Sequence, residues 1–212
     1  MSWHKKDEGR RGYHHGHLRE ALIKAALDLI GEKGPAGFSF AEAARSAGVS
    51  AAAPYRHFRD RDALVAEVAR QGFERFGAFL ENAWSDGAPD PVTAFDNVGR
   101  AYLAFARTEP AYYAAMFEAQ VAPDATPELA KAADESFAVL QRAAEAMVAR
   151  LPKERRPPAR MVSLHMWSFA HGIASLFARG DAARRKLPMT PEELLEAGFL
   201  IYLDGLGKDP KS

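Results

Sequence analysis

Apolar residues recur at every third or fourth position along almost the whole of this 212-residue chain, and this spacing constrains the fold more than any other feature. Such spacing places the apolar side chains on one face of an α-helix. No stretch shows the sustained alternation, or the enrichment in Val, Ile and Thr, that is typical of β-strands. The chain is therefore predicted to be all-α.

Glycine and proline mark where the helices end. Gly34-Pro35, Glu109-Pro110 and the stretch from Pro152 to Pro158 interrupt the periodicity, and a Pro/Gly-rich loop follows residue 84. We expect helices at about 15–33, 40–47, 51–58, 61–84, 91–108, 111–118, 126–151, 159–178 and 191–206.

Polar residues in front of four of these helices have the chemistry of caps. Ser39 and Glu42 form the spacing of a capping box, and Thr190 and Glu193 repeat it before the last helix. Ser50 is expected to cap the third helix and Asp60 the fourth. Two short helices are therefore expected between two long ones.

Residues 40–58 have the pattern of a helix-turn-helix. Ala43 and Ala44 are small enough to let two helices cross closely, and Gly48 can adopt the left-handed conformation of a tight turn. Val49 and Phe58 are expected to pack against the first helix, which leaves one face of the third helix exposed. The DNA major groove is about 12 Å wide, so it accepts such a helix.

The charge of the chain is divided unevenly along its length. Residues 1–62 contain 11 Lys and Arg against 8 Asp and Glu, a net charge of +3, and the remainder carries −3. Five of the seven histidines also lie in the first 62 residues. This asymmetry is a weak indication of a polyanionic partner for the N-terminal part.

Several functions are excluded or disfavoured by what the sequence contains. The absence of cysteine excludes disulfides, thiolate metal sites and cysteine nucleophiles. No apolar run is long enough for a membrane span and no signal peptide is recognised, which predicts a cytoplasmic protein. We see no nucleophile motif, Gly-rich phosphate loop or metal constellation, so an enzyme and a cofactor are not expected. A helical protein-binding adaptor without DNA-binding activity is the alternative, but it leaves the helix-turn-helix unexplained.

His14, His15 and His17 are close enough in sequence to be considered as metal ligands. A metal site needs a further ligand and fixed geometry, and none is evident here. Phosphate contact and a polar start of the first helix are the other two interpretations, and we expect no metal site.

The stretch from about Tyr13 to Phe76 resembles the tetracycline-repressor family of transcriptional regulators. The resemblance rests on Leu22 to Gly34, on the core from Ser39 to Ser50, and on Tyr55-x-His57-Phe58 before a long helix. Tyr13-His14-His15-Gly16 and Trp167-x-x-x-His171-Gly172 look like one branch of that family.

This resemblance implies a homodimer that binds double-stranded operator DNA and responds to a small apolar effector. It implies a basic arm at 1–12, a helix-turn-helix domain at 13–60, and a ligand-binding and dimerisation domain at 61–212. The expected function is a ligand-responsive regulator of the repressor type acting on a palindromic operator. The basic arm either enters the minor groove or is a solvated tail.

The resemblance also assigns roles to residues of the helix-turn-helix. Expected DNA contacts come from Ser39, Ser50, Ala51, Ala52, Ala53, Tyr55, Arg56, His57 and Arg61. Arg61 stands where the family usually has lysine, and Pro54 replaces a leucine. Ala51 to Ala53 offer only methyl groups to the bases, so specificity must come from Arg56, Tyr55, the arm or DNA shape.

In the second domain, most aromatic residues are expected to be core. The candidate effector residues are Tyr102, Phe105, Tyr113, Met116 and His165. The last two long helices match the family's dimer-forming helices, and the expected contacts are Leu164, Trp167, Phe169, Phe199, Leu200 and Leu203. His171 is expected to be a hydrogen-bonded core histidine beside a close-packing Gly172.

Overall fold

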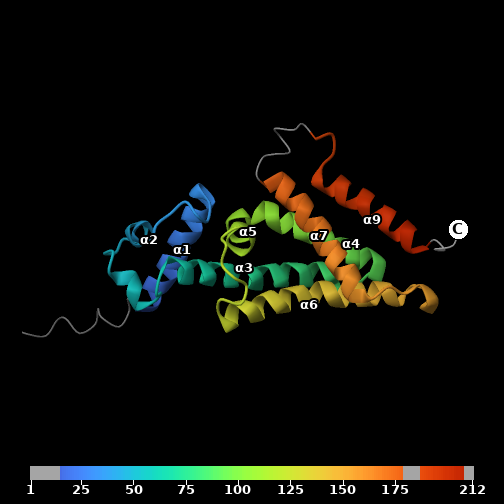
Figure 1. Cartoon of the computed structure of the whole chain (residues 1–212), viewed down its shortest axis with the longest axis horizontal. Helices are drawn as coiled ribbons and strands as arrows, with labels where there is room; N and C mark the ends of the chain where they lie inside the picture. The colour runs from blue at the N-terminus through green and yellow to red at the C-terminus, as the bar shows by residue number, and fades with distance from the viewer. Residues whose placement is uncertain (1–14, 179–186, 208–212) are drawn as a thin grey trace, which may run out of the picture. The chain divides into compact units, whose positions relative to one another are not determined.

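The computed structural model describes residues 15–178 and 187–207, and every regular element in these ranges is helical (Figure 1). The all-α prediction is confirmed. The expected basic arm at 1–12 lies outside the described residues. The elements are α1 (His15–Lys33), α2 (Phe40–Ser46), η1 (Ala53–Arg56), α3 (Arg61–Trp84), η2 (Ser85–Gly87), α4 (Pro91–Thr108), α5 (Pro110–Phe117), α6 (Pro127–Ala149), η3 (Lys153–Arg155), α7 (Ala159–Ala178) and α9 (Pro191–Gly207).

Capping side chains start α2, α3 and α9 where the sequence predicts caps. The Ser39 hydroxyl accepts from the amide of Glu42 at 3.2 Å, and the Glu42 carboxylate accepts from the amide of Ser39 at 2.8 Å. Thr190 and Glu193 form the same reciprocal pair at the start of α9. Asp60 accepts from the amide of Ala63 at 2.8 Å. These local bonds satisfy donors that have no partner within the helix.

Two compact units are distinguished by the contacts within the chain, and they divide α3 at Gly72. The first contains α1, α2, η1, the first half of α3, and Ala111–Leu129. Its core includes the fully buried Leu22 and Leu64. A Cβ atom added to Gly72 would lie 2.8 Å from the sulfur of Met116, so α3 and α5 pack closely at this glycine.

The second unit is formed by the second half of α3 with α4, α6, α7 and α9. Both α7 and α9 pack on α4, and Phe95 and Phe105 of α4 are fully buried. The Phe76 ring of α3 meets the Tyr102 ring edge-on at a centroid distance of 5.0 Å. This unit therefore has its own apolar core.

The segment at 51–58 differs from the expected α-helix. Only Ala53–Arg56 is helical, and it is a 3₁₀-helix. The amide of Ala53 donates to the carbonyl of Ser50 at 3.0 Å, which is the shorter spacing of a 3₁₀ turn. Pro54 has no amide proton with which to make the α-helical bond to Ser50, and it disfavours the α conformation at Ala53. The proline that the family resemblance marked as a departure therefore shortens this helix.

The expectations for His171 and Gly172 have different outcomes. His171 is half-buried, and its Nδ1 is hydrogen-bonded to the Tyr102 hydroxyl at 2.9 Å, as expected of a core histidine. Gly172 is exposed, and a Cβ atom added there would meet nothing within 4 Å. The prediction of a close-packing glycine is wrong for the single chain.

Candidate nucleic-acid interface

The helix-turn-helix is built on small buried residues. Ala43 and Ala44 of α2 are completely buried, and α2 packs against α1. Gly48 has φ of +72°, so it makes the left-handed turn that the sequence predicts. Phe58 is buried and Val49 is half-buried behind the turn. These contacts hold η1 with one side toward solvent.

The outward side of this segment carries Tyr55 and Arg56. Tyr55 is 64% exposed, and its ring meets Phe40 edge-on at a centroid distance of 5.1 Å, which limits its movement. Arg56, Ala51 and Ala52 are also exposed, and Ala53 is half-buried. The surface therefore offers one phenol, one guanidinium and several methyl groups to a partner.

Ser39 and Ser50 are both exposed, but only one of them caps a helix. Ser39 makes the capping box of α2. The residue before η1 is Ala52, and no side chain caps this element. The prediction that Ser50 caps the third helix is wrong, because the helix begins later than expected.

His57 and Arg61 face inward. His57 is half-buried, and its Nε2 has no hydrogen-bond partner among the described residues. The Arg61 guanidinium donates to the carbonyl of Phe38 at 2.9 Å and lies 4.7 Å above the ring of that residue. Arg61 therefore connects the start of α3 to the loop before α2, and a phosphate contact by this side chain stays a prediction.

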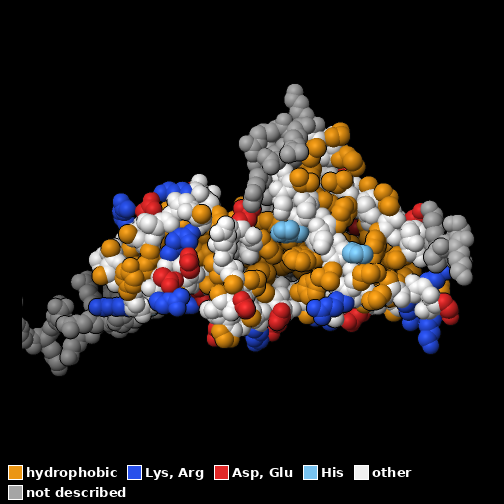
Figure 2. All heavy atoms as spheres, in the orientation of Figure 1, with side chains coloured by type: hydrophobic (Ala, Val, Ile, Leu, Met, Phe, Trp, Pro, Cys, Tyr) orange, Lys and Arg blue, Asp and Glu red, His pale blue; other side chains and the backbone are white. Residues whose placement is uncertain are grey.

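Two further cations on this unit were not among the predicted contacts. Arg45, in the last turn of α2, is exposed, and the Arg59 side chain is 85% exposed beside Asp60. Figure 2 shows Lys and Arg side chains on the part of the molecule that contains α1 and α2. Arg45 lies next to the turn at Gly48, and Arg59 follows η1. These positions are the signal that could have identified the two residues.

Ion pairs fix the charged residues inside this unit. Glu67 of α3 accepts from Arg70 at 2.7 Å and lies 3.0 Å from Arg19 of α1. Burial raises the pKa of Glu67, but the hydrogen bonds from Arg70 and the charge of Arg19 outweigh burial and hold the pKa below its ordinary value. The Arg19–Glu67 ion pair joins α1 to α3.

Glu42 has a strongly lowered pKa of about 2. The largest cause is the hydrogen bond from the Lys33 ammonium group at 2.9 Å, followed by the bond from the amide of Ser39. The carboxylate is thus held in its charged form by the end of α1 and by its own capping box.

The five predicted effector residues belong to two different units. Tyr102 and Phe105 are buried in α4, in the second unit, whereas Tyr113 and Met116 are buried in α5, in the first. His165 alone of the five lines a cavity of about 430 Å³ bounded by α4, α7 and α9.

The predicted dimer contacts are mostly exposed. Leu164, Trp167, Phe169 and Leu200 are 37–59% exposed, Leu203 is half-buried, and Ile201, which was not predicted, is 74% exposed. Phe199 is only 7% exposed and packs on Phe95 at a centroid distance of 5.7 Å. In the single chain it faces the core, and a contact from this residue to a second copy stays a prediction.

The fold and this surface define a helix-turn-helix DNA-binding regulator with a second helical unit. Residues 22–68 match the family described as bacterial regulatory proteins, tetR family. Residues 95–200 match the tetracyclin repressor-like C-terminal domain. The chain therefore belongs to the tetR family, whose members bind DNA and dimerise and are transcription regulators, not enzymes.

Solved structures share the fold of this chain. A protein with unknown function from Rhodococcus sp. RHA1 is 32% identical, with 93% of this chain and 100% of that chain covered and a TM-score of 0.75. The TetR family transcriptional regulator PfmR from Thermus thermophilus shares the fold at 20% identity, with 84% and 94% covered and a TM-score of 0.62. A regulatory protein of the tetR family from Rhodococcus RHA1 does so at 17% identity, 91% and 98% coverage, and a TM-score of 0.65. No curated protein matches the chain.

Neither a membrane-spanning helix nor a metal-binding cluster is found in the described part of the chain. No helix in the ranges 15–178 and 187–207 is long and apolar enough to cross a membrane. The same ranges contain no group of three or more His, Asp or Glu side chains that could hold a metal ion.

Proposed function

We propose that this protein is a ligand-responsive transcriptional repressor that binds a palindromic operator as a homodimer. The observation that carries the proposal is the outward side of η1, where Tyr55 and Arg56 are exposed on a buried helix-turn-helix scaffold. A phenol and a guanidinium can reach both phosphates and base edges. Arg45 and Arg59 add positive charge around this segment.

The proposed dimer forms through the exposed apolar side chains of α7 and α9. Large apolar groups at such exposure are typical of a surface that another chain covers. A two-fold dimer would place its two copies of η1 about one DNA turn apart, roughly 34–36 Å. The proposed domain limits are 13–60 for DNA binding and 61–212 for ligand binding and dimerisation, preceded by a basic arm at 1–12.

The proposed response is allosteric. A small molecule bound in the second unit would change the spacing of the two DNA-binding segments, because α3 contributes residues to both units. Only a ligand that binds one of the two states more tightly can produce this shift.

The test is selection of DNA from a random-sequence library by the purified protein, followed by gel shifts at increasing salt. We expect a palindrome and a steep loss of affinity with salt, because phosphate contacts release counterions. The double variant Tyr55→Ala, Arg56→Ala should lose most of this affinity. The control Lys24→Ala changes an exposed lysine of α1 that pairs with Asp28. Failure to enrich any sequence would favour the protein-binding adaptor instead.

A further inference from the structure

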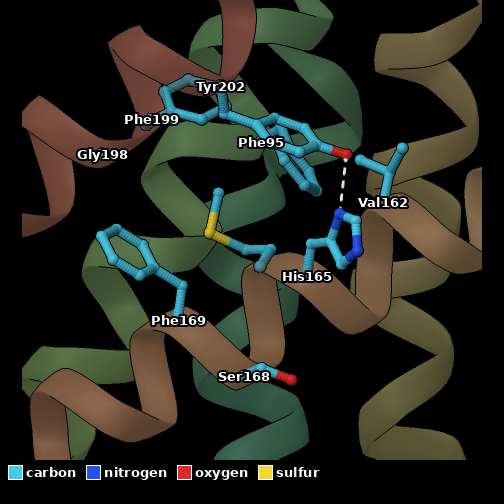
Figure 3. Close-up of a pocket in the computed structure, with 9 residues that line it drawn as sticks. Phe95, Val162, His165, Ser168, Phe169, Gly198, Phe199 and Tyr202 are labelled. Atoms are coloured by element: carbon cyan, nitrogen blue, oxygen red, sulfur yellow. Dashed lines mark hydrogen bonds between the residues drawn. The ribbon is translucent and has the colours of Figure 1, made fainter. Parts of the chain in front are cut away.

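The cavity between α4, α7 and α9 has the size and walls of a small-molecule site. Its volume of about 430 Å³ falls within the ~300–1,000 Å³ of such sites. Phe95 comes from α4, and Phe169 and Phe199 come from α7 and α9 (Figure 3). All of these residues belong to the second unit.

The lining is mostly apolar. None of its nine residues is Asp, Glu, Lys or Arg, and the polar side chains are Ser168, His165 and Tyr202. A charge held against these walls would be partly dehydrated without gaining a charged partner. The lining therefore favours a ligand with an apolar body.

His165 and Tyr202 form the polar end. The Nδ1 atom of His165 and the hydroxyl of Tyr202 are hydrogen-bonded at 3.2 Å, as the dashed line in Figure 3 marks. Their rings are perpendicular at a centroid distance of 5.6 Å. Burial raises the pKa of Tyr202, so its phenol stays neutral at physiological pH.

This pair presents a free hydrogen-bond donor in either tautomer of the His165 ring. If the Tyr202 hydroxyl donates to Nδ1, the imidazole carries its proton on Nε2 and donates from there. If Nδ1 donates to Tyr202, the phenol hydrogen remains available. A ligand oxygen that accepts a hydrogen bond is satisfied in both cases.

We propose that this cavity binds a small molecule with an aromatic or acyl body and one terminal acceptor oxygen, which His165 or Tyr202 holds. The inference rests on the proposed ligand response and names the chemical class of the effector. Of the effector residues that the sequence indicated, His165 lines this cavity.

Gly198 provides a way to close the cavity with one methyl group. A Cβ atom at Gly198 would lie 2.1 Å from the Phe169 ring, so that ring must move if alanine stands there. Movement inward fills the cavity and movement outward removes its wall. Gly205 lies in the same helix, and a Cβ atom there would meet nothing within 4 Å. Gly205→Ala is therefore the matched control for Gly198→Ala, since both changes raise helix propensity alike.

The experiment uses two probes of one shape, 2-acetylnaphthalene and 2-ethylnaphthalene, and measures their binding to the full chain by calorimetry. We expect the ketone to bind about threefold to tenfold more tightly than the hydrocarbon, which is the worth of one hydrogen bond. Gly198→Ala should weaken both probes at least about tenfold, and Gly205→Ala should leave them unchanged. Circular dichroism establishes that each variant is folded.

A second variant tests the polar end without altering the walls. The double change His165→Phe, Tyr202→Phe keeps aromatic rings and removes both donors, and we expect it to bind the two probes equally. The proposal is overturned if wild type binds neither probe, if Gly198→Ala and Gly205→Ala bind alike, or if the ketone keeps its advantage in the double variant. Binding that leaves operator affinity unchanged would instead contradict the proposed ligand response, while the site would stand.

Discussion

Arg56 and Arg61 are five positions apart and have opposite surroundings. Arg56 is exposed on η1, whereas the Arg61 side chain is only 24% exposed and donates to the carbonyl of Phe38. A planar guanidinium can satisfy a backbone acceptor and stack on a ring at the same time. The same residue type therefore serves the proposed DNA surface at one position and the internal structure at the other.

These surroundings predict different effects of removing the two side chains. Arg56→Ala should lower operator affinity and reduce the salt slope by about one unit, without changing the free energy of unfolding. Arg61→Ala should lower the free energy of unfolding by about 1–3 kcal/mol, because the Phe38 carbonyl loses its partner. Gel shifts across salt and urea unfolding measure the two effects. Equal salt slopes for wild type and Arg56→Ala would show that Arg56 does not contact DNA phosphates.

Glu42 predicts how the helix-turn-helix responds to acid. Its folded-state pKa of about 2 lies below the ordinary value of 4.5, so its contribution to stability is complete above pH 4.5 and is lost as the pH falls toward 2. An NMR titration of the Glu42 carboxyl carbon should give a midpoint near 2. Lys33→Ala should raise this midpoint, since the Lys33 hydrogen bond is the largest cause of the shift. Lys24→Ala, which changes a lysine of the same helix paired with Asp28, should not.

Among the elements, η1 departs most from a standard helix-turn-helix. Ala53–Arg56 is a single 3₁₀ turn, and the amides of His57 and Phe58 both donate to the carbonyl of Pro54. A short turn presents fewer side chains to a groove than a helix of two turns. The proposed DNA surface is correspondingly small.

Pro54→Ala should convert this turn toward an α-helix. Alanine supplies the missing amide proton for a bond to the Ser50 carbonyl and releases Ala53 from the restriction that proline imposes. We expect α-helical Cα chemical shifts at 52–57 in the variant and not in wild type. Unchanged shifts would mean that packing around the buried Pro54, and not the absent amide, sets the conformation.

The elements also indicate how far sequence alone can reach. The sequence predicts Ser39, Ser50, Asp60 and Thr190 as caps. All except Ser50 are caps, because a cap depends on residues only three positions apart. The sequence does not predict the 3₁₀ conformation of η1, although Pro54 is visible in it. A proline near a helix start is compatible with a helix or a turn, so its presence in the sequence does not by itself decide between them.

At the scale of the whole molecule, α7 and α9 leave large apolar side chains exposed. Hydrophobic side chains gather over these helices in Figure 2, and Leu200 and Ile201 are 59% and 74% exposed. In a dimer these groups would leave water, and their burial would stabilise association.

Ile201→Lys should therefore weaken the proposed dimer at least about tenfold, since it would place an unpaired charge between two apolar surfaces. Analytical ultracentrifugation measures dimerisation, and circular dichroism should show unchanged helix content. Met189→Lys introduces the same charge at an exposed apolar residue that precedes α9, and it should leave the dimer intact. A dimer that survives Ile201→Lys would contradict this assignment of the interface.

Neither the cavity nor the orientation of Phe199 could be predicted from the sequence, and the reason is the same for both. Periodicity places Phe199 and Leu200 on neighbouring faces of one helix, but the packing of α9 on α4 decides which of them faces inward. His165 stands out in the sequence as a polar group among apolar neighbours, whereas its partner Tyr202 lies 37 positions away. Contacts between distant segments leave little trace in one sequence.

The methyl groups of Ala51 and Ala52 have a consequence for how targets could evolve. A surface with so few donors and acceptors distinguishes individual base pairs weakly, so point changes in an operator would be tolerated there. The distance between half-sites allows no such freedom. One inserted base pair turns the second half-site by roughly 35° around the duplex axis, out of reach of a two-fold protein. The base sequence of such operators could change during evolution, whereas the spacing between the two half-sites would stay fixed.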